Sequence, residues 1–172
     1  MFEKYKSDNP VNKVRMSVAF AFGSVAHIWA TFFGAGLIRP APGTWGTLAG
    51  WVVFLLLEPY VSAAAWLLII AATFVLGAWA CGKTSEDLGV PDHGSIVIDE
   101  VFAIWLLLAL TPATLGWQIA AFFAFRFFDI VKCPPADYFD KKMKNGFGIM
   151  FDDAIAAGYA WLVLVALQYA IG

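Results

Sequence analysis

Long uncharged stretches alternate with short polar segments along this 172-residue chain. Apart from cysteine and tyrosine, no ionisable residue occurs in four of these stretches, residues 40–57, 59–82, 101–125 and 154–172. A helix needs about 20 apolar residues to cross the roughly 30 Å hydrocarbon core of a bilayer. Residues 61–80 and 154–171 approach that length, so the pattern predicts membrane-spanning helices.

Proline divides two of the apolar stretches near their middles. Glu58-Pro59 interrupts residues 46–80, and Thr111-Pro112 interrupts residues 101–125. Because proline breaks or kinks a helix, each stretch is predicted to form a hairpin of two membrane segments. Each hairpin returns the chain to the side that it left. The polar segments at residues 39–47, 83–100 and 126–153 are therefore expected on one face of the membrane.

Two stretches fit this pattern less simply. Residues 46–57 would form a helix only about 18 Å long, so tilt, bilayer thinning or partial burial has to make up the difference. Residues 18–37 are long enough to span, but a span there would place the first polar segment on the opposite face. Glycine at positions 23, 34 and 36 favours an interfacial or re-entrant element instead.

The expected fold is all-α, a single domain over residues 1–172. It is a polytopic integral membrane bundle of two helical hairpins, a C-terminal helix and a re-entrant or interfacial N-terminal segment, with residues 1–16 as a cytoplasmic tail. Every lysine and arginine lies in the tail or the polar segments, and none lies at the hairpin turns. The positive-inside rule therefore places the polar segments in the cytoplasm and the C-terminus outside.

Composition supports a membrane protein over a soluble one. Hydrophobic residues make up 61% of the chain and charged residues only 14%, whereas soluble domains carry about 25% charged residues. Buried helices of a soluble all-α protein are the less favoured interpretation. The net charge is −2, and the lysines at 141, 142 and 144 form the one basic cluster, so nucleic-acid binding has little support. Cys81 and Cys133 are expected to be packed thiols.

Acidic residues gather where apolar helices are expected to begin. Asp99 and Glu100 open the second hairpin, and Asp152 and Asp153 are expected in the first turn of the last helix. Either pair alone is typical of a helix N-terminus, where the dipole favours carboxylates. Together with Asp129 they would form a self-repelling cluster of five. Because Mg²⁺ prefers oxygen ligands, we expect all five as candidate metal ligands and one of them as a catalytic base.

Basic residues near the third polar segment are candidate phosphate ligands. Arg126, Asp129 and Lys132 are spaced to share roughly one helix face. One interpretation is a structural salt bridge between Arg126 and Asp129. The other is that Arg126 and Lys132 clamp phosphate oxygens, Arg126 as a bidentate donor and Lys132 as a point charge. Pro134-Pro135 is expected to end this helix.

The other two polar segments offer weaker candidates. Thr44 and Thr47 lie in a glycine-rich turn that could cradle a phosphate at the start of the next helix or serve only as a turn. His93 is a candidate acid or base, although a histidine in a polar loop more often makes ordinary hydrogen bonds. Ser95, two residues later, is a further candidate phosphate ligand. His27, in an apolar stretch, is expected to be a hydrogen-bonded packing residue.

These motifs resemble the phosphatidylglycerophosphatase A family of the bacterial inner membrane, over residues 34–158. The resemblance rests on Gly-Ala-Gly-Leu at 34–37, Pro-Gly-Thr-Trp-Gly-Thr-Leu-Ala at 42–49, Asp-His-Gly-Ser-Ile-Val-Ile-Asp-Glu at 92–100, Phe-Arg-Phe-Phe-Asp-Ile-Val-Lys at 125–132 and Gly-Ile-Met-Phe-Asp-Asp at 148–153. It implies a Mg²⁺-dependent lipid phosphatase of phospholipid metabolism. The implied reaction converts phosphatidylglycerophosphate, a membrane-embedded phospholipid substrate, into phosphatidylglycerol and inorganic phosphate.

We therefore expect metal-assisted hydrolysis, in which the carboxylates hold Mg²⁺ and the basic and hydroxyl residues hold phosphate. A covalent aspartyl-phosphate route stays open beside direct attack by water. The alternative from another class is a small-ion or lipid transporter, because charges within membrane segments also mark ion pathways. A pathway would spread charges through the depth of the bilayer, whereas here they collect at one face. The sequence leaves the number of metal ions and the oligomeric state open.

Overall fold

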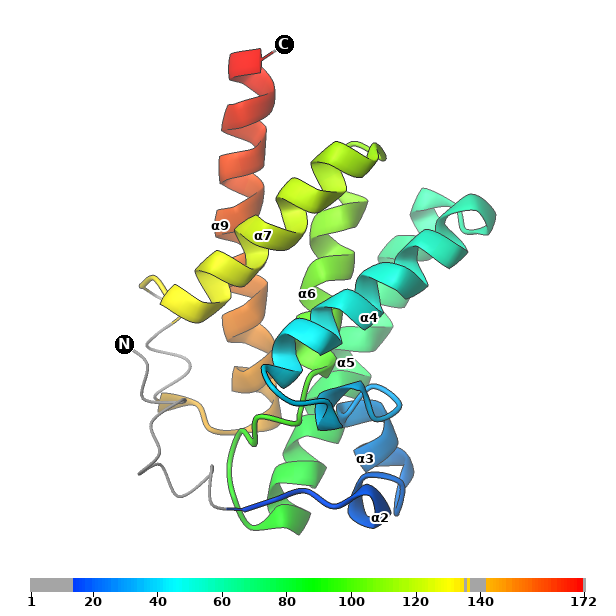
Figure 1. Ribbon diagram of the computed structural model, residues 1–172, viewed down its shortest axis with the longest axis vertical. Helices are drawn as coiled ribbons and strands as arrows, with labels where there is room; N and C mark the ends of the chain where they lie inside the picture. The colour runs from blue at the N-terminus through cyan, green and yellow to red at the C-terminus, as the bar shows by residue number, and fades with distance from the viewer. Residues whose placement is uncertain (1–13, 135, 137–141, 172) are drawn as a thin grey trace.

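The computed structural model describes residues 14–134, 136 and 142–171, and this part of the chain is helical and contains no strand (Figure 1). The predicted all-α class is confirmed. Residues 1–13 and Lys141, which belong to the predicted tail and basic cluster, lie outside the described residues. The elements, in order, are α2 (Val18–Ala21), α3 (Val25–Ala30), η2 (Ala35–Leu37), α4 (Pro42–Leu57), η3 (Glu58–Tyr60), α5 (Ala63–Leu88), α6 (Ile98–Ala109), α7 (Leu115–Val131) and α9 (Gly146–Ile171).

Both predicted hairpin turns are present. The chain reverses after α4 through the short helix η3, which contains Pro59, and Ser62 then caps α5 by accepting a hydrogen bond from the Ala65 amide at 3.2 Å. It reverses again between α6 and α7, around Pro112. Figure 1 shows both turns and the C-terminus toward one end of the molecule. The opposite ends of α4, α6 and α7 are thereby brought near one another.

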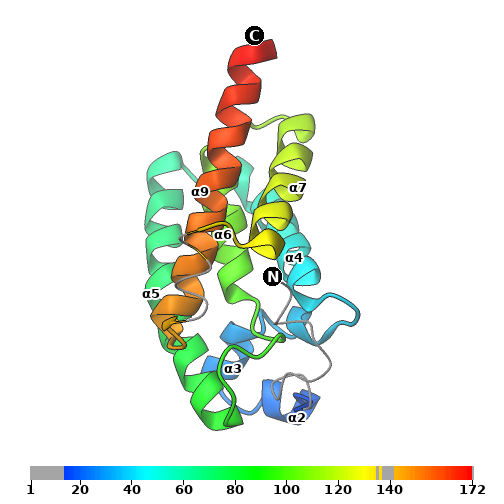
Figure 2. The same cartoon turned by 90° about the vertical axis from the view of Figure 1, so that its left-hand side faces the viewer.

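Helix α6 lies at the centre of the bundle and contacts α4, α5, α7 and α9 (Figures 1 and 2). Nearly all of its 12 residues are buried. Glycine lets α4 come close, because a Cβ at Gly50 would lie 3.2 Å from the Val101 Cα, and the Trp105 indole donates to the Gly50 carbonyl at 2.8 Å. A helix of this length is only about 18 Å long. Its neighbours therefore surround it on most sides.

The last helix begins earlier than predicted, and this corrects the position of its acidic pair. Helix α9 starts at Gly146, so Asp152 and Asp153 lie six and seven residues inside it rather than in its first turn. The reason is close packing against α5, since a Cβ at position 146 would lie 1.8 Å from the Ala78 carbonyl oxygen. The amide of Gly148 also bonds to the Asn145 side chain at 2.9 Å, which caps the new start.

Residues 18–37 do not form one long helix. They fold into α2, α3 and η2, of four, six and three residues, each far too short to cross a bilayer. Within the described part of the chain, α5 and α9 are the two helices long and apolar enough to span a membrane. His27 packs as predicted, with its ring against Phe20 and its Nε2 3.0 Å from Asp87 on α5.

Candidate active site

Three buried carboxylates from two helices meet beside the core. Asp99 and Glu100 occupy the first turn of α6, and Asp153 faces them from α9. One oxygen from each lies within 4.8 Å of the others, and the residues are only 3%, 6% and 2% exposed. Helices α6 and α9 are in contact, which places Asp153 beside the first turn of α6. Three carboxylates this close and this buried require a compensating cation or protons.

Glu100 and Asp153 each present a buried oxygen to this group. Glu100 Oε2 and Asp153 Oδ2 accept no hydrogen bond from the described part of the chain. A buried polar atom without a partner costs about 1–3 kcal/mol, and more when it is charged. Oxygens left in this state are suitable ligands for a hard divalent cation such as Mg²⁺.

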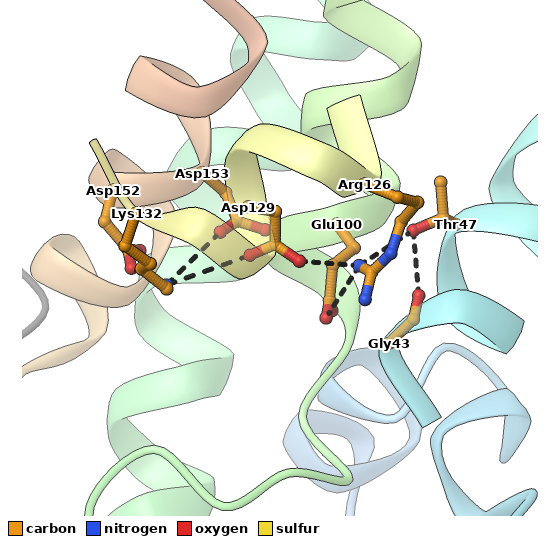
Figure 3. Close-up of polar contacts among 8 residues, drawn as sticks. All are labelled: Gly43, Thr47, Glu100, Arg126, Asp129, Lys132, Asp152 and Asp153. Atoms are coloured by element: carbon orange, nitrogen blue, oxygen red, sulfur yellow. Dashed lines mark hydrogen bonds and ion pairs between the residues drawn. The ribbon is translucent and has the colours of Figure 1, made fainter. Parts of the chain in front are cut away.

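Arg126 joins three helices at one edge of the carboxylate group (Figure 3). Its Nη1 lies 2.7 Å from Asp129 Oδ2 on the same helix and 3.5 Å from Glu100 Oε1 on α6. It also donates to Thr47 Oγ1 on α4 at 3.3 Å. Arg126 as a whole is 7% exposed, so its charge is balanced mainly inside the protein. The predicted salt bridge between Arg126 and Asp129 is confirmed.

Lys132 joins the other edge of the group (Figure 3). Its Nζ contacts Asp152, and lies 3.8 Å from Asp129 Oδ1 and 3.9 Å from Asp153 Oδ1. Lys132 follows the last residue of α7 and has a φ of 48°, a left-handed conformation that non-glycine residues rarely adopt. That conformation ends the helix three residues before Pro134. A residue held in a rare backbone conformation at a charge cluster is typical of functional sites.

The network contains more acidic than basic groups. It holds the five predicted carboxylates and the two predicted cations, Arg126 and Lys132, so full ionisation would leave three negative charges to be compensated. Charge of this density is expensive inside a protein unless it is neutralised. The arrangement can therefore attract a divalent cation, while Arg126 and Lys132 supply positive charge for an anion held next to it.

Helix α4 reaches the site through its first turns. The Thr47 hydroxyl donates to the Gly43 carbonyl at 2.8 Å and accepts from Arg126, so its contacts are within the protein. Sequence reasoning did not select Gly43 as a separate site residue. A Cβ there would lie 2.0 Å from Glu100 Oε1 and 3.2 Å from Arg126 Nη1. The glycine between Pro42 and Thr44 in the motif was the signal that could have identified it.

The other predicted site residues have different neighbours. His93 Nδ1 accepts from the Ser95 amide at 3.1 Å, and Nε2 lies 2.9 Å from the Val14 carbonyl oxygen. The Ser95 hydroxyl accepts from Arg39 at 3.4 Å. Thr44 is half-buried in the first turn of α4. The contacts of His93 and Ser95 are those expected for residues that organise the loop before α6. Catalytic or phosphate-binding roles for His93, Ser95 and Thr44 remain predictions.

Comparison with known proteins places the chain in one family. The sequence model described as Phosphatidylglycerophosphatase A matches residues 28–168. The protein named Phosphatidylglycerophosphatase A in Haemophilus influenzae is 47% identical over 164 residues, which cover 94% of this chain and 96% of that protein. Its Escherichia coli K12 namesake is 36% identical over 147 residues, covering 85% of this chain and 83% of that protein.

A third relative carries a different name. A putative phosphatidylinositol-3-phosphatase from Bacteroides thetaiotaomicron is 35% identical over 151 residues, covering 83% of this chain and 92% of that protein. No solved structure matches the chain. Because the family model and the first two relatives agree over most of the chain, the protein belongs to the phosphatidylglycerophosphatase A family and is a phosphoric monoester hydrolase.

Proposed function

We propose that this chain is a Mg²⁺-dependent lipid phosphatase that hydrolyses phosphatidylglycerophosphate to phosphatidylglycerol and inorganic phosphate. Family membership supports the reaction. The single structural observation that carries the proposal is the buried group of Asp99, Glu100 and Asp153, whose oxygens lie within 4.8 Å of one another beside two cationic side chains. A phosphate monoester and a divalent cation are the two ligands that such a pairing of charges fits.

Asp99, Glu100 and Asp153 would hold the metal, because Glu100 Oε2 and Asp153 Oδ2 are buried oxygens in need of a partner. When bound, Mg²⁺ supplies charge neutralisation and Lewis-acid polarisation of phosphoryl oxygens. Asp129 and Asp152 take part through Lys132, which bridges them. The role of Asp129 and Asp152 would be to set the position of the Lys132 ammonium group, while the other three carboxylates hold the metal.

The protein's own residues then have defined tasks. Arg126 and Lys132 bind phosphate oxygens and stabilise the charge that grows on them in the transition state. One carboxylate of the group accepts a proton from water as the water oxygen bonds to phosphorus. The bond from phosphorus to the glycerol oxygen breaks, and that oxygen takes up a proton to give the lipid alcohol and inorganic phosphate. Attack by a carboxylate to form an aspartyl-phosphate is the covalent variant of the same displacement.

Helix lengths support the proposed placement in a membrane. Helices α5 and α9 each have 26 residues, about 39 Å, which is enough to cross a bilayer. Helix α6 begins at the carboxylates and extends only about 18 Å to its turn. We therefore place the carboxylates toward the cytoplasmic end of the bundle, on the same side as the N-terminal helices (Figure 1).

The N-terminal helices fit the headgroup layer of an anionic membrane. Val25, Phe33 and Phe22 are 75%, 63% and 51% exposed, although they are large and apolar. No acidic residue occurs between Asp8 and Glu58, whereas this stretch contains lysine and arginine. Exposed apolar side chains with basic charge are the features that bind a phospholipid surface. We place this face in the cytoplasmic leaflet of the inner membrane, in accord with the positive-inside rule.

The test is phosphate release from phosphatidylglycerophosphate by the purified protein in detergent, with Mg²⁺ and with EDTA. Wild-type protein and Glu58→Gln, which alters an exposed acid at a hairpin turn, are expected to release phosphate only with Mg²⁺. Asp99→Asn and Asp153→Asn are expected to release none above background. Full activity of either variant, or of the wild type in EDTA, would overturn the proposal.

Phosphatidylinositol 3-phosphate serves as the competing substrate, because the Bacteroides relative is named for it. We expect a higher kcat/KM for phosphatidylglycerophosphate, in keeping with the greater identity to the Haemophilus protein. Equal or reversed values would contradict the assigned lipid while leaving the reaction class intact.

A further inference from the structure

We propose that Thr47 is a positioning residue that holds the Arg126 guanidinium in place independently of the carboxylates, a role that rests on the proposed function. Thr47 is completely buried in α4. It is therefore closed to a lipid phosphate unless the helix moves. Its use must lie in what it contacts inside the protein.

The direction of the hydrogen bonds defines that use. A threonine hydroxyl has one hydrogen to donate and two lone pairs that accept. Thr47 Oγ1 lies 2.8 Å from the Gly43 carbonyl oxygen, which can only accept, so the hydrogen goes there. The oxygen is then left to accept from Arg126 Nη1 at 3.3 Å. Thr47 thus acts on the arginine as a fixed acceptor, with its rotamer locked by its own helix (Figure 3).

Two further acceptors in the described part of the chain lie near Arg126 Nη1, and both are charged and shared. Asp129 Oδ2 lies 2.7 Å away but also belongs to a carboxylate close to Lys132, and Glu100 Oε1 lies 3.5 Å away in the proposed metal group. A bound divalent cation would polarise the Glu100 carboxylate and shift its position, which would weaken its contact with Arg126. The neutral Thr47 hydroxyl is a weaker ligand for Mg²⁺ than the neighbouring carboxylates. Thr47 therefore keeps the same hold on Arg126 whether or not the metal is bound.

Geometry makes such a hold useful. The guanidinium is planar and rigid, so fixing Nη1 from two sides sets the plane in which its other donors lie. Phosphate recognition by arginine depends on that plane. Asp129 holds Nη1 from α7 and Thr47 holds it from α4. Loss of Thr47 would leave Arg126 near the phosphate but in a less defined orientation.

The test compares Thr47→Val, Thr47→Ser and Thr111→Val. Valine has nearly the shape of threonine without the hydroxyl, and serine keeps the hydroxyl. Thr111 is the matched control, because it is buried and donates to the carbonyl four residues earlier at 2.7 Å, but it lies at the hairpin turn after α6. Kinetics with phosphatidylglycerophosphate and inhibition by inorganic phosphate are measured for each, after thermal unfolding has verified the fold.

For Thr47→Val we expect kcat to fall by about tenfold, since a hydrogen bond to a charged group is lost. The inhibition constant of inorganic phosphate should rise, while Thr47→Ser and Thr111→Val stay near the wild type. Equal losses of kcat in Thr47→Val and Thr111→Val would overturn the proposal. They would mean that only the hydrogen bond from each hydroxyl to its own helix matters. A Thr47→Ser variant as impaired as Thr47→Val would also overturn the proposal.

A second measurement does not depend on activity. The midpoints of thermal unfolding of Thr47→Val, Arg126→Met and the double variant form a double-mutant cycle. Coupling between the two changes is expected, because Arg126→Met removes the partner that Thr47 serves. If the shifts in unfolding midpoint of the two single variants simply added in the double variant, the proposed contact would be refuted. If the wild type released no phosphate from the lipid but the cycle showed coupling, the proposed function would fail and the positioning contact would stand.

Discussion

Gly43 provides the most quantitative prediction for the site. It lies in the first turn of α4, next to the carboxylate of Glu100, and a Cβ added there would come within 2.0 Å of Glu100 Oε1. Real Cβ contacts below 3.0 Å are essentially never seen, so in Gly43→Ala this oxygen must move by about 1 Å. The clashing atom is the end of a side chain, so we expect the fold to survive while the geometry of the site changes.

A misplacement of about 1 Å in an active site can cost roughly 100-fold in rate, or about 2.7 kcal/mol of activation free energy. We therefore expect Gly43→Ala to lower kcat by about two orders of magnitude. The assay is phosphate release from phosphatidylglycerophosphate, with circular dichroism to verify helicity. Gly158→Ala is the matched control, because this exposed position in α9 has nothing within 4 Å of the added Cβ.

A double variant tests the cause of the loss. Glu100→Asp shortens the side chain and withdraws the carboxylate from α4, so Gly43→Ala added to it should cost little more. The reasoning is refuted if Gly43→Ala keeps wild-type kcat, or if it costs the same 100-fold in the Glu100→Asp background.

Three further predictions concern the fold and its charges. Gly146→Ala should prevent stable folding, unlike Gly158→Ala, because its Cβ would lie 1.8 Å from a backbone oxygen of α5; a wild-type unfolding midpoint would contradict this. Mg²⁺ at 100 times its Kd should stabilise the protein by about 2.7 kcal/mol, seen as a rise in the unfolding midpoint that EDTA reverses. An unchanged midpoint would argue against a bound ion. Lys132→Met should destabilise by about 3–5 kcal/mol in chemical unfolding, since it leaves buried carboxylates without their cation, whereas Lys144→Met, at an exposed lysine, should not.

The sequence predicted the hairpins well because their signals are local. Proline at 59 and 112 interrupts long apolar stretches, and the structure turns at both places. The spacing of Arg126 and Asp129 likewise predicted their salt bridge from helix geometry alone. Such features depend on a few neighbouring residues, so a pattern in the chain is enough to find them.

Features that depend on packing were harder to predict. The start of α9 was placed too late, because the close approach of Gly146 to α5 leaves no mark in the hydrophobic pattern. The hydrogen bond that Arg126 donates to Thr47 joins residues 79 positions apart, and the sequence pattern did not reveal it. Likewise, the left-handed conformation of Lys132 is not evident from its residue type.

The central claim is that Asp99, Glu100 and Asp153 hold the divalent cation that the reaction requires. The most direct test is a titration of the purified protein with Mn²⁺, which accepts the same oxygen ligands, followed by electron paramagnetic resonance. We expect wild-type protein and Glu58→Gln to bind Mn²⁺, Mg²⁺ to displace it, and Asp153→Asn to lose this binding. Equal binding of Mn²⁺ by Asp153→Asn and the wild type, or none by the wild type, would contradict the account.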